Sequence, residues 1–236
     1  MPIVTDWPNA ISIEEIWQWH RMKCQGDIPQ RYLSLAPEMV AMITERGLIQ
    51  PKITYEIGPI AGIAAGRIAL ADGREITDAD DLIEHMQGAT EVLAAAATIG
   101  DGLEGAIAAL VAEKKLTRAL VIEEIGIAAL FKLSDQARAV AEAEARQRTF
   151  RTTGPICPGD HGISFTHQRV LLDLAGAERI GISANGAGMM RPVRSLSMIV
   201  GLGKAVAKVH KRDNCDACKA RGTCRYRTRD IESIVA

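Results

Sequence analysis

The segment "ATEVLAAAATIG", residues 89–100, runs from Val92 to Ile99 without a charged side chain. A short apolar run bounded by polar residues and glycine fits a strand that is buried on both faces. We predict such a strand here, in spite of the alanines. Asp101 and Glu104 follow directly, and both are suited to cap a helix that begins in "GLEGAIAALVAEKK".

Two segments upstream of this run also have the composition of strands. "ITYEIGPI" (53–60) and "RIALADGREI" (67–76) contain apolar and β-branched residues interrupted by glycine. The dipeptide Asp72-Gly73 in the second segment is a common hairpin turn. We therefore predict two strands and a hairpin ahead of residue 89.

The chain downstream alternates between helical and strand-like patterns. Residues 118–149 predict one long helix, with an apolar first half that is buried and a charged second half that emerges from the protein. Pro155 and Pro158 then end the helix and begin a loop. Residues 165–177 predict a further helix, and residues 179–203 predict two apolar strands joined by a turn that contains glycine and proline.

The first 50 residues have the pattern of short helices. "SIEEIWQWHRMK" (12–23) opens with a serine and has glutamate three residues later, which is a capping-box pattern. "APEMVAMITERGL" (36–48) predicts a second helix, with Pro37 near its first turn and Gly47 at its end. We expect three parts in the chain: an N-terminal helical extension (1–52), a domain of strands and helices (53–204) and a basic, cysteine-bearing tail (205–236).

Composition excludes several classes of protein. The 236 residues are 47% hydrophobic, enough to bury a core, yet no apolar stretch approaches the roughly 18–20 residues of a membrane span. The N-terminus lacks the basic and apolar regions of a secretory signal. The five cysteines form an odd set with three of them clustered, which favours a reducing compartment, so we expect a cytoplasmic protein.

The end of the chain is strongly basic, although the net charge is only −1. Two acids, Asp213 and Asp216, accompany nine basic residues between positions 204 and 229: Lys204, Lys208, Lys211, Arg212, Lys219, Arg221, Arg225, Arg227 and Arg229. Such a run is either a solvated face or a contact for an acidic protein or nucleic acid. Nucleic acid is disfavoured because Tyr226 is the one aromatic side chain there that could stack on a base.

The segment "CDACKARGTCRYR" (215–227) places Cys215, Cys218 and Cys224 within ten residues. The spacing allows three thiolates to converge, which suits either a [4Fe-4S] cluster or a zinc site with three cysteines and a histidine, while unligated thiols are the third alternative. Neighbouring Lys and Arg lower thiol pKa values and favour a metal. Cys157 is the first candidate for a fourth ligand; the others are His210, His161 and an exogenous group.

Four segments occur in an order that resembles a known family. They are "AATIGDGLE" (96–104), "PGDHGISFTHQ" (158–168), "MMRPVRSLSMIVG" (189–201) and the cysteine segment at 215–227. Together they resemble the activation (reactivation) domain of vitamin B12-dependent methionine synthase, over roughly residues 53–227. The resemblance implies an α+β fold, with a twisted, largely antiparallel sheet flanked by helices.

The same resemblance implies a role in cobalamin chemistry. In methionine synthase this domain binds S-adenosylmethionine and covers the cobalamin, so that cob(II)alamin is reduced and remethylated. The present sequence has no Asp-x-His-x-x-Gly segment to supply a histidine to cobalt. We therefore expect an accessory protein for a separate corrinoid-binding methyltransferase, and the redox role favours an iron-sulfur cluster over zinc. The alternative is a zinc- or cluster-stabilised nucleic-acid-binding or structural protein.

The sequence departs from the family at the adenosylmethionine motif, which there runs Arg-x-x-x-Gly-Tyr. Pro155 stands at the arginine position and Asp160 at the tyrosine position, and Gly159 alone is retained. The guanidinium that would grip the ligand carboxylate is missing. We therefore expect weak or no binding of adenosylmethionine at Gly159 and Asp160, unless a nearby arginine compensates; the candidates are Arg151, Arg191 and Arg194.

Other residues have structural interpretations. His167 is expected to cap or pack in its helix rather than to touch a cofactor. Met189 and Met190 are expected in the core. No Ser-His-Asp order, Walker loop or Gly-x-Gly-x-x-Gly unit after a strand occurs, so hydrolase, NTPase and Rossmann interpretations have no support, and no catalytic residue is assigned.

Overall fold

The structure is a computed structural model that describes residues 2–5, 30–160, 163–206 and 222–223. The predicted helix at 12–23 and the cysteines of the tail lie outside these residues. An antiparallel sheet with strand order β4-β3-β2-β5-β9-β6 forms the centre, and β1 pairs with β2. Its strands are β1 (Ile3–Val4), β2 (Lys52–Ala64), β3 (Arg67–Leu70), β4 (Glu75–Ile76), β5 (Glu91–Thr98), β6 (Arg151–Thr152) and β9 (Ser195–Gly203).

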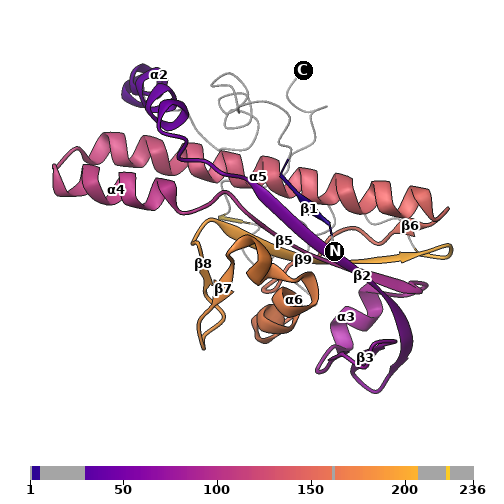
Figure 1. The fold of residues 1–236 in the computed structure, drawn as a ribbon. Helices are drawn as coiled ribbons and strands as arrows, with labels where there is room; N and C mark the ends of the chain where they lie inside the picture. Colours follow the sequence, from indigo (N-terminus) through magenta and orange to yellow (C-terminus); the bar gives the residue numbers. More distant parts are fainter. Residues whose placement is uncertain (1, 6–29, 161–162, 207–221, 224–236) are drawn as a thin grey trace.

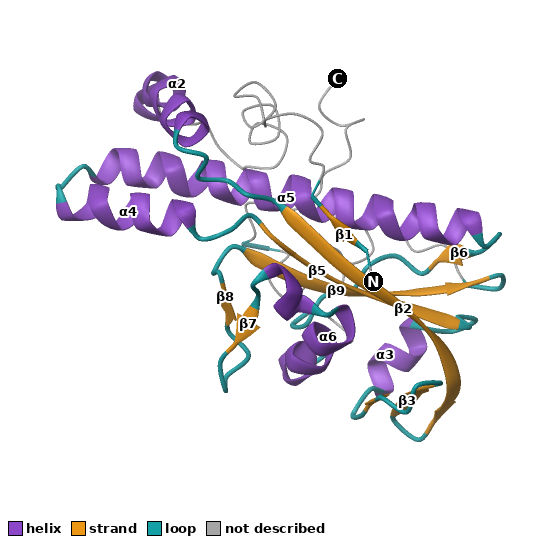
Figure 2. Ribbon diagram, viewed as in Figure 1, coloured by secondary structure: helices purple, strands orange, loops and turns teal. Residues whose placement is uncertain are grey.

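Helices cover both faces of the sheet (Figures 1 and 2). One face packs against α2 (Gln30–Glu45), α4 (Gly102–Ala112) and α5 (Leu116–Gln147). The other face packs against α3 (Asp80–His85), α6 (Gln168–Ala175) and the short 3-10 helix Ala177–Ile180. A separate two-stranded sheet, β7 (Ser183–Ala184) with β8 (Met190–Arg191), lies beside α6. The α+β fold with a largely antiparallel sheet flanked by helices is confirmed.

Strand β5 occupies the middle of the sheet, as its uncharged sequence predicts. Its partners are β2 on one side and β9 on the other, with Ala95 opposite both Tyr55 and Met198. Leu93, Ala95 and Ala97 face the α5 side, whereas Val92, Ala94 and Ala96 face the α6 side. Because both faces are buried, the six residues from Val92 to Ala97 are all apolar, and alternation with polar residues is absent. The hairpin at Asp72-Gly73 is also confirmed, between β3 and β4.

The predicted exposure of the second half of α5 is wrong. Leu133, Ala137, Ala141 and Ala145 recur every four residues and are all buried against the sheet. Residues at this spacing share one face of a helix. Most of the charged residues between them lie towards solvent, whereas Glu144 accepts a hydrogen bond from Tyr55. The second half of the helix therefore lies on the sheet, whereas its first turns run beside α4 beyond the end of the sheet (Figure 1).

Three predicted helix boundaries also need correction. Helix α5 ends at Gln147, before β6, and Thr149 has a φ of +58°, so Pro155 and Pro158 do not end it. Helix α2 begins at Gln30, so Pro37 lies inside the helix rather than in its first turn, although the chain does leave the helix at Gly47, where φ is +59°. Asp101 is the N-cap residue of α4, but its side chain makes no capping hydrogen bond.

Candidate functional site

Residues 155–160, where the resemblance would place the adenosylmethionine motif, form a tight turn at the edge of the sheet. Ile156 and Ile199 of β9 exchange backbone hydrogen bonds of 3.0 and 2.9 Å. Immediately afterwards the Cys157 N–H donates to Asp160 Oδ2 at 2.9 Å, and the Asp160 N–H donates to the Cys157 carbonyl at 2.9 Å. Gly159 has a φ of +94° and donates its N–H to the Ile163 carbonyl at 3.0 Å. The structure thus brings Cys157, Gly159 and Asp160 together.

Asp160 closes this turn with its own carboxylate. Burial raises the pKa of Asp160, while the hydrogen bond from the Cys157 N–H and the nearby His85 oppose the rise. The residue as a whole stays exposed, and the net effect keeps the pKa of Asp160 above its ordinary value. His85 itself is fixed by a 3.3 Å contact from Nε2 to the Gly154 carbonyl oxygen. A tyrosine at position 160 could not make the carboxylate contact that closes the turn.

Cys157 lies between the core and the surface. Its side chain packs against the larger core cluster on the α5 face and also hydrogen bonds to Asp160. The residue is partly exposed. Among the described residues, no three His, Cys, Asp or Glu side chains lie close enough together to hold a metal ion. The grouping of Cys157 with Cys215, Cys218 and Cys224 therefore remains a prediction, since the last three lie outside the described residues.

Phe165 also belongs to this site, although it was not among the site residues predicted from the sequence. Its ring lies between two glycines of positive φ: a Cβ on Gly159 would be 3.3 Å from Phe165 Cδ2, and a Cβ on Gly188 would be 3.1 Å from Cε1. The side chain nevertheless remains 44% exposed. An aromatic residue between two glycine-rich segments, in a chain with 4% aromatic residues, is the signal that could have identified it.

Residues at the start of α6 fix Phe165 in place. His167 is buried, with Nδ1 3.1 Å from the Ser164 carbonyl oxygen and Nε2 2.6 Å from that of Thr77. Buried Gln168 donates from Nε2 to Ser197 Oγ of β9 at 2.7 Å. The prediction that His167 packs in its helix is confirmed.

The arginines proposed as substitutes for the missing guanidinium are separated by the fold. Arg194 is 7% exposed and donates to Glu123 of α5, so its charge is already paired on the α5 face of the sheet. Arg151 pairs with Gly203 at the far end of the edge segment, about 17 Å of extended chain from Ile156. Arg191 is exposed on β8, three residues after Gly188. Arg191 is the one of the three that stays available near the turn.

The methionines before β9 differ from the prediction. Met189 is 58% exposed, so its assignment to the core is wrong. Met190 is partly buried and packs against the α6-side core cluster, where its sulfur lies 3.5 Å from Gln168 Nε2. The exposed Met189 and Phe165 both adjoin Gly188, which makes this part of the surface apolar.

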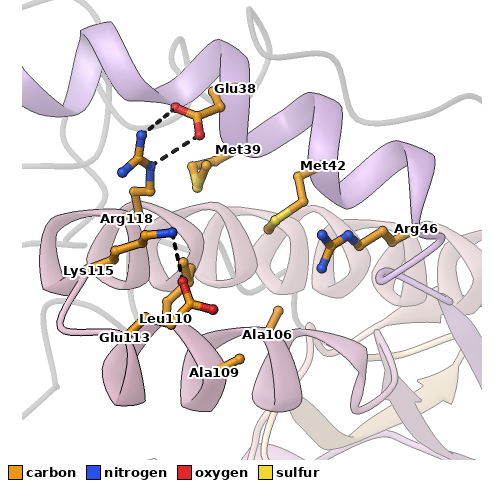
Figure 3. Close-up of a pocket in the computed structure, with 10 residues that line it drawn as sticks. All are labelled: Glu38, Met39, Met42, Arg46, Ala106, Ala109, Leu110, Glu113, Lys115 and Arg118. Carbon is orange, nitrogen blue, oxygen red and sulfur yellow. Dashed lines mark hydrogen bonds and ion pairs between the residues drawn. The ribbon is translucent and has the colours of Figure 1, made fainter.

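Two cavities have walls that include none of the turn residues 155–160. One of about 310 Å³ separates α2 from the α4–α5 hairpin, with Met39, Met42 and Leu110 among its walls and the pairs Arg118–Glu38 and Lys115–Glu113 at its rim (Figure 3). The other, of about 350 Å³, is lined by Thr77, His167 and neighbouring residues at the start of α6. Both mix charged and apolar walls, and neither contains a residue that the sequence predicted to bind a cofactor or metal.

Comparison with known proteins shows which fold the chain shares. No family model matches the sequence, and no curated protein matches it. Among solved structures, the crystal structure of the MetH reactivation domain bound to AdoHcy matches with a TM-score of 0.61 and 13% sequence identity, over 97% of this chain and 90% of that chain. At this identity the likeness establishes a common fold. Within the described residues, no helix is long and apolar enough to cross a membrane.

Proposed function

We propose that this protein is an accessory factor for a cobalamin-dependent methyltransferase system and supports reductive reactivation of the corrinoid. The observation that carries the proposal is the fold shared with the MetH reactivation domain over nearly the whole chain. The motif order of the sequence agrees with it, because the segments 96–104, 158–168 and 189–201 that suggested the family form β5 with the start of α4, the edge turn with Phe165, and β9. Fold alone does not define activity, so the site must support the role separately.

The edge turn supports docking against another macromolecule better than enclosure of a small ligand. Phe165, Met189 and Arg191 are exposed around it, and aromatic residues, methionine and arginine are all enriched in protein interfaces. No cobalt-ligating Asp-x-His-x-x-Gly segment occurs in these 236 residues. The corrinoid would therefore be carried elsewhere and presented to this surface.

The residues of the turn do not fit the adenosylmethionine grip of the family. Pro155 offers no side-chain donor, Asp160 would repel a ligand carboxylate, and Arg194 is committed to Glu123. We therefore propose that a methyl donor is not held at this turn as it is in the family. Cys157 is partly exposed at the same turn, and we propose that its sulfur joins a cluster held by Cys215, Cys218 and Cys224.

An iron-sulfur cluster there would supply the electron that reduces cob(II)alamin, and the basic residues of the tail would attract an acidic partner. Electrostatic attraction accelerates the encounter of two proteins and weakens as salt screens it. The chain's own contribution is to bind the partner and to hold the electron donor close to the corrin ring. Zinc in place of the cluster would leave docking intact but remove the redox step.

The test uses purified protein, a cob(II)alamin-loaded corrinoid protein and a low-potential reductant, with cobalt reduction and methylation followed by absorbance. We expect the wild-type protein to accelerate reduction, and the triple variant Lys211→Glu, Arg212→Glu, Arg221→Glu to lose most of this effect at low salt. The matched control replaces three exposed arginines outside the tail, Arg46, Arg67 and Arg146, by Glu. If the wild-type protein neither binds nor accelerates reduction of the corrinoid protein, the proposed function is wrong.

A further inference from the structure

Helix α4 is apolar yet largely uncovered. Its sequence from Gly102 to Ala112 contains one charged residue, Glu104, and Leu103 is its one fully buried side chain. Ala108 and Val111 are exposed. The hairpin that α4 forms with α5 extends beyond the end of the sheet (Figure 1). A surface helix normally turns a polar face to solvent, so an apolar exposed face indicates contact with another molecule.

Four exposed apolar side chains of α4 and α5 share one side of the hairpin. Glu104 of α4 accepts from the Val193 N–H at 2.7 Å, and Glu123 of α5 accepts from Arg194. Since both glutamates hold neighbouring residues of one segment, they point to the same side. Positions three, four and seven residues away from each glutamate share its helix face. These positions are Ala108 and Val111 on α4, and Leu120 and Leu116 on α5.

We call the surface formed by Ala108, Val111, Leu116, Leu120 and Val193 the hairpin face. Val111 and Leu120 are each 49% exposed, Leu116 is 57% exposed and Val193 is 62% exposed. These four are half of the eight large hydrophobic side chains that are exposed in the described part of the chain. Their concentration on one side separates the hairpin face from the scattered apolar residues of an ordinary surface.

The charges around the hairpin face differ at its two ends. Lys114 and Lys115 are at the tip, where Lys115 pairs with Glu113 at 2.7 Å. Asp101, Glu104 and Glu123 are at the base. Within the described residues, neither Lys114 nor Asp101 forms an ion pair. A second copy that packs in the opposite direction brings each basic tip to the acidic base of the other copy, and a two-fold axis repeats this contact twice.

We propose that the hairpin face is the interface of a two-fold symmetric homodimer. Leu120, which lies level with Ala108 in the middle of the hairpin, is nearest the axis and packs against its symmetry mate. Val111 and Leu116 near the tip of each copy contact Val193 of the other. Helix α4 is only about 16 Å long, so the interface is small and the dimer belongs to the weak, micromolar class.

Light scattering across a concentration series tests the dimer. We expect the mass of the wild-type protein to rise from 25.4 kDa towards twice that value between about 1 µM and 1 mM. Leu120→Glu should keep the monomer mass throughout, because two carboxylates would meet at the axis. Ile63→Glu is the matched control, since Ile63 is also an exposed aliphatic residue, 37% accessible, but lies on β2. It should associate like the wild-type protein.

A charge exchange tests the orientation of the two copies. Lys114→Asp and Asp101→Lys should each raise the dissociation constant severalfold, and the double variant should recover most of the loss because the opposite charges are then exchanged. A wild-type protein that stays monomeric over the whole range overturns the proposal, as does a Leu120→Glu variant that still dimerises. A monomer whose Leu120→Glu variant loses binding to the corrinoid protein would assign the hairpin face to that partner instead, and likewise overturn it.

Discussion

The guanidinium of Arg194 pairs with the carboxylate of Glu123, and this contact ties the start of β9 to helix α5. The arginine reaches the helix by crossing Gly126, where a Cβ would lie 2.6 Å from Arg194 Nε and 2.9 Å from Arg194 Cδ. Leu103 of α4 would be equally close, at 2.9 Å. The glycine inside α5 therefore makes room for the arginine that joins strand and helix.

Gly126→Ala should destabilise the protein, although alanine is the better helix former. The added methyl group meets buried atoms that cannot move away freely, and overpacking of this kind costs about 1–3 kcal/mol. Gly105→Ala is the matched control, because a Cβ at that helical position meets nothing within 4 Å and should stabilise α4 by up to about 1 kcal/mol. Urea unfolding measures both. Equal effects of the two substitutions would show that the Arg194 side chain does not require a glycine at position 126.

The sequence predicted β5 well because a strand buried on both faces leaves a continuous apolar run. The second half of α5 was predicted less well because Ala137, Ala141 and Ala145 alternate with charged residues and resemble a solvated helix. Alanine is small enough to let the helix backbone approach the sheet closely, so burial there does not require large apolar side chains.

In the candidate site, the sequence predicted the conformation of the turn but not the positions of the arginine side chains. Pro158-Gly159-Asp160 has the composition of a tight turn, and it forms one. The side to which Arg194 points depends on the register of β9 against β5, and its partner Glu123 is 71 residues away. Side chains alternate across a sheet, so a sequence without a known register cannot assign an arginine to one face.

Tyr55 should make stability decrease at alkaline pH. Burial, together with the 2.6 Å hydrogen bond to Glu144, raises the pKa of Tyr55 to about 12. Between pH 10 and this value the unfolded chain ionises its tyrosine while the folded protein keeps the proton, so the free energy of unfolding falls as pH rises. Tyr55→Phe should lower the free energy of unfolding by about 1 kcal/mol at pH 7. The variant should also show no fall in this free energy between pH 10 and 12 that depends on Tyr55. An unchanged alkaline slope in the variant would contradict the assignment.

Glu144 should make the stability of the protein decrease at acidic pH. Hydrogen bonds from Tyr55 and from Arg148, the latter at 2.5 Å, lower the pKa of Glu144. Its contribution is complete above the ordinary carboxyl pKa and is lost as pH falls through the lowered value. Glu144→Gln should therefore lower stability at pH 7 and have less effect at pH 3. Unfolding midpoints in urea at the two pH values give the comparison.

S-adenosylhomocysteine, the ligand bound to the MetH reactivation domain of similar fold, should bind this protein weakly or not at all. Pro155 and Asp160 supply no cation for its carboxylate, and Arg194 is already paired. Calorimetry should give no measurable heat at micromolar concentrations. A dissociation constant in the low micromolar range would show that another arginine has taken over, and Arg191→Ala would then identify whether the exposed arginine on β8 is responsible.

Metal content should depend on all three clustered cysteines together. A set of three thiolates that loses one becomes open and labile, so Ala at Cys215, Cys218 or Cys224 should abolish stoichiometric metal. Cys157→Ala should lower retention if its sulfur completes the site, whereas Cys24→Ala is the control and should leave the metal unchanged. Anaerobic iron and sulfide analysis with absorbance near 400 nm distinguishes a cluster from zinc. Full metal in all three single variants would exclude the cluster of cysteines as the site.

Gly188→Ala should disturb the edge turn through Phe165. Gly188 has a φ of +80°, which strains any L-residue, and its added Cβ would also lie 3.1 Å from the Phe165 ring. Gly181→Ala isolates the strain, because Gly181 has a φ of +82° and a Cβ there meets nothing within 4 Å. We expect Gly181→Ala to lower the free energy of unfolding by about 1 kcal/mol, and Gly188→Ala to lower it by about 1–3 kcal/mol more because of steric crowding.

A double-mutant cycle with Phe165→Ala, measured by urea unfolding, tests the contact between the ring and Gly188. In the Phe165→Ala background the extra destabilisation by Gly188→Ala should disappear, because the ring is gone. Additive effects of the two substitutions would mean that Phe165 does not rest on Gly188 in solution.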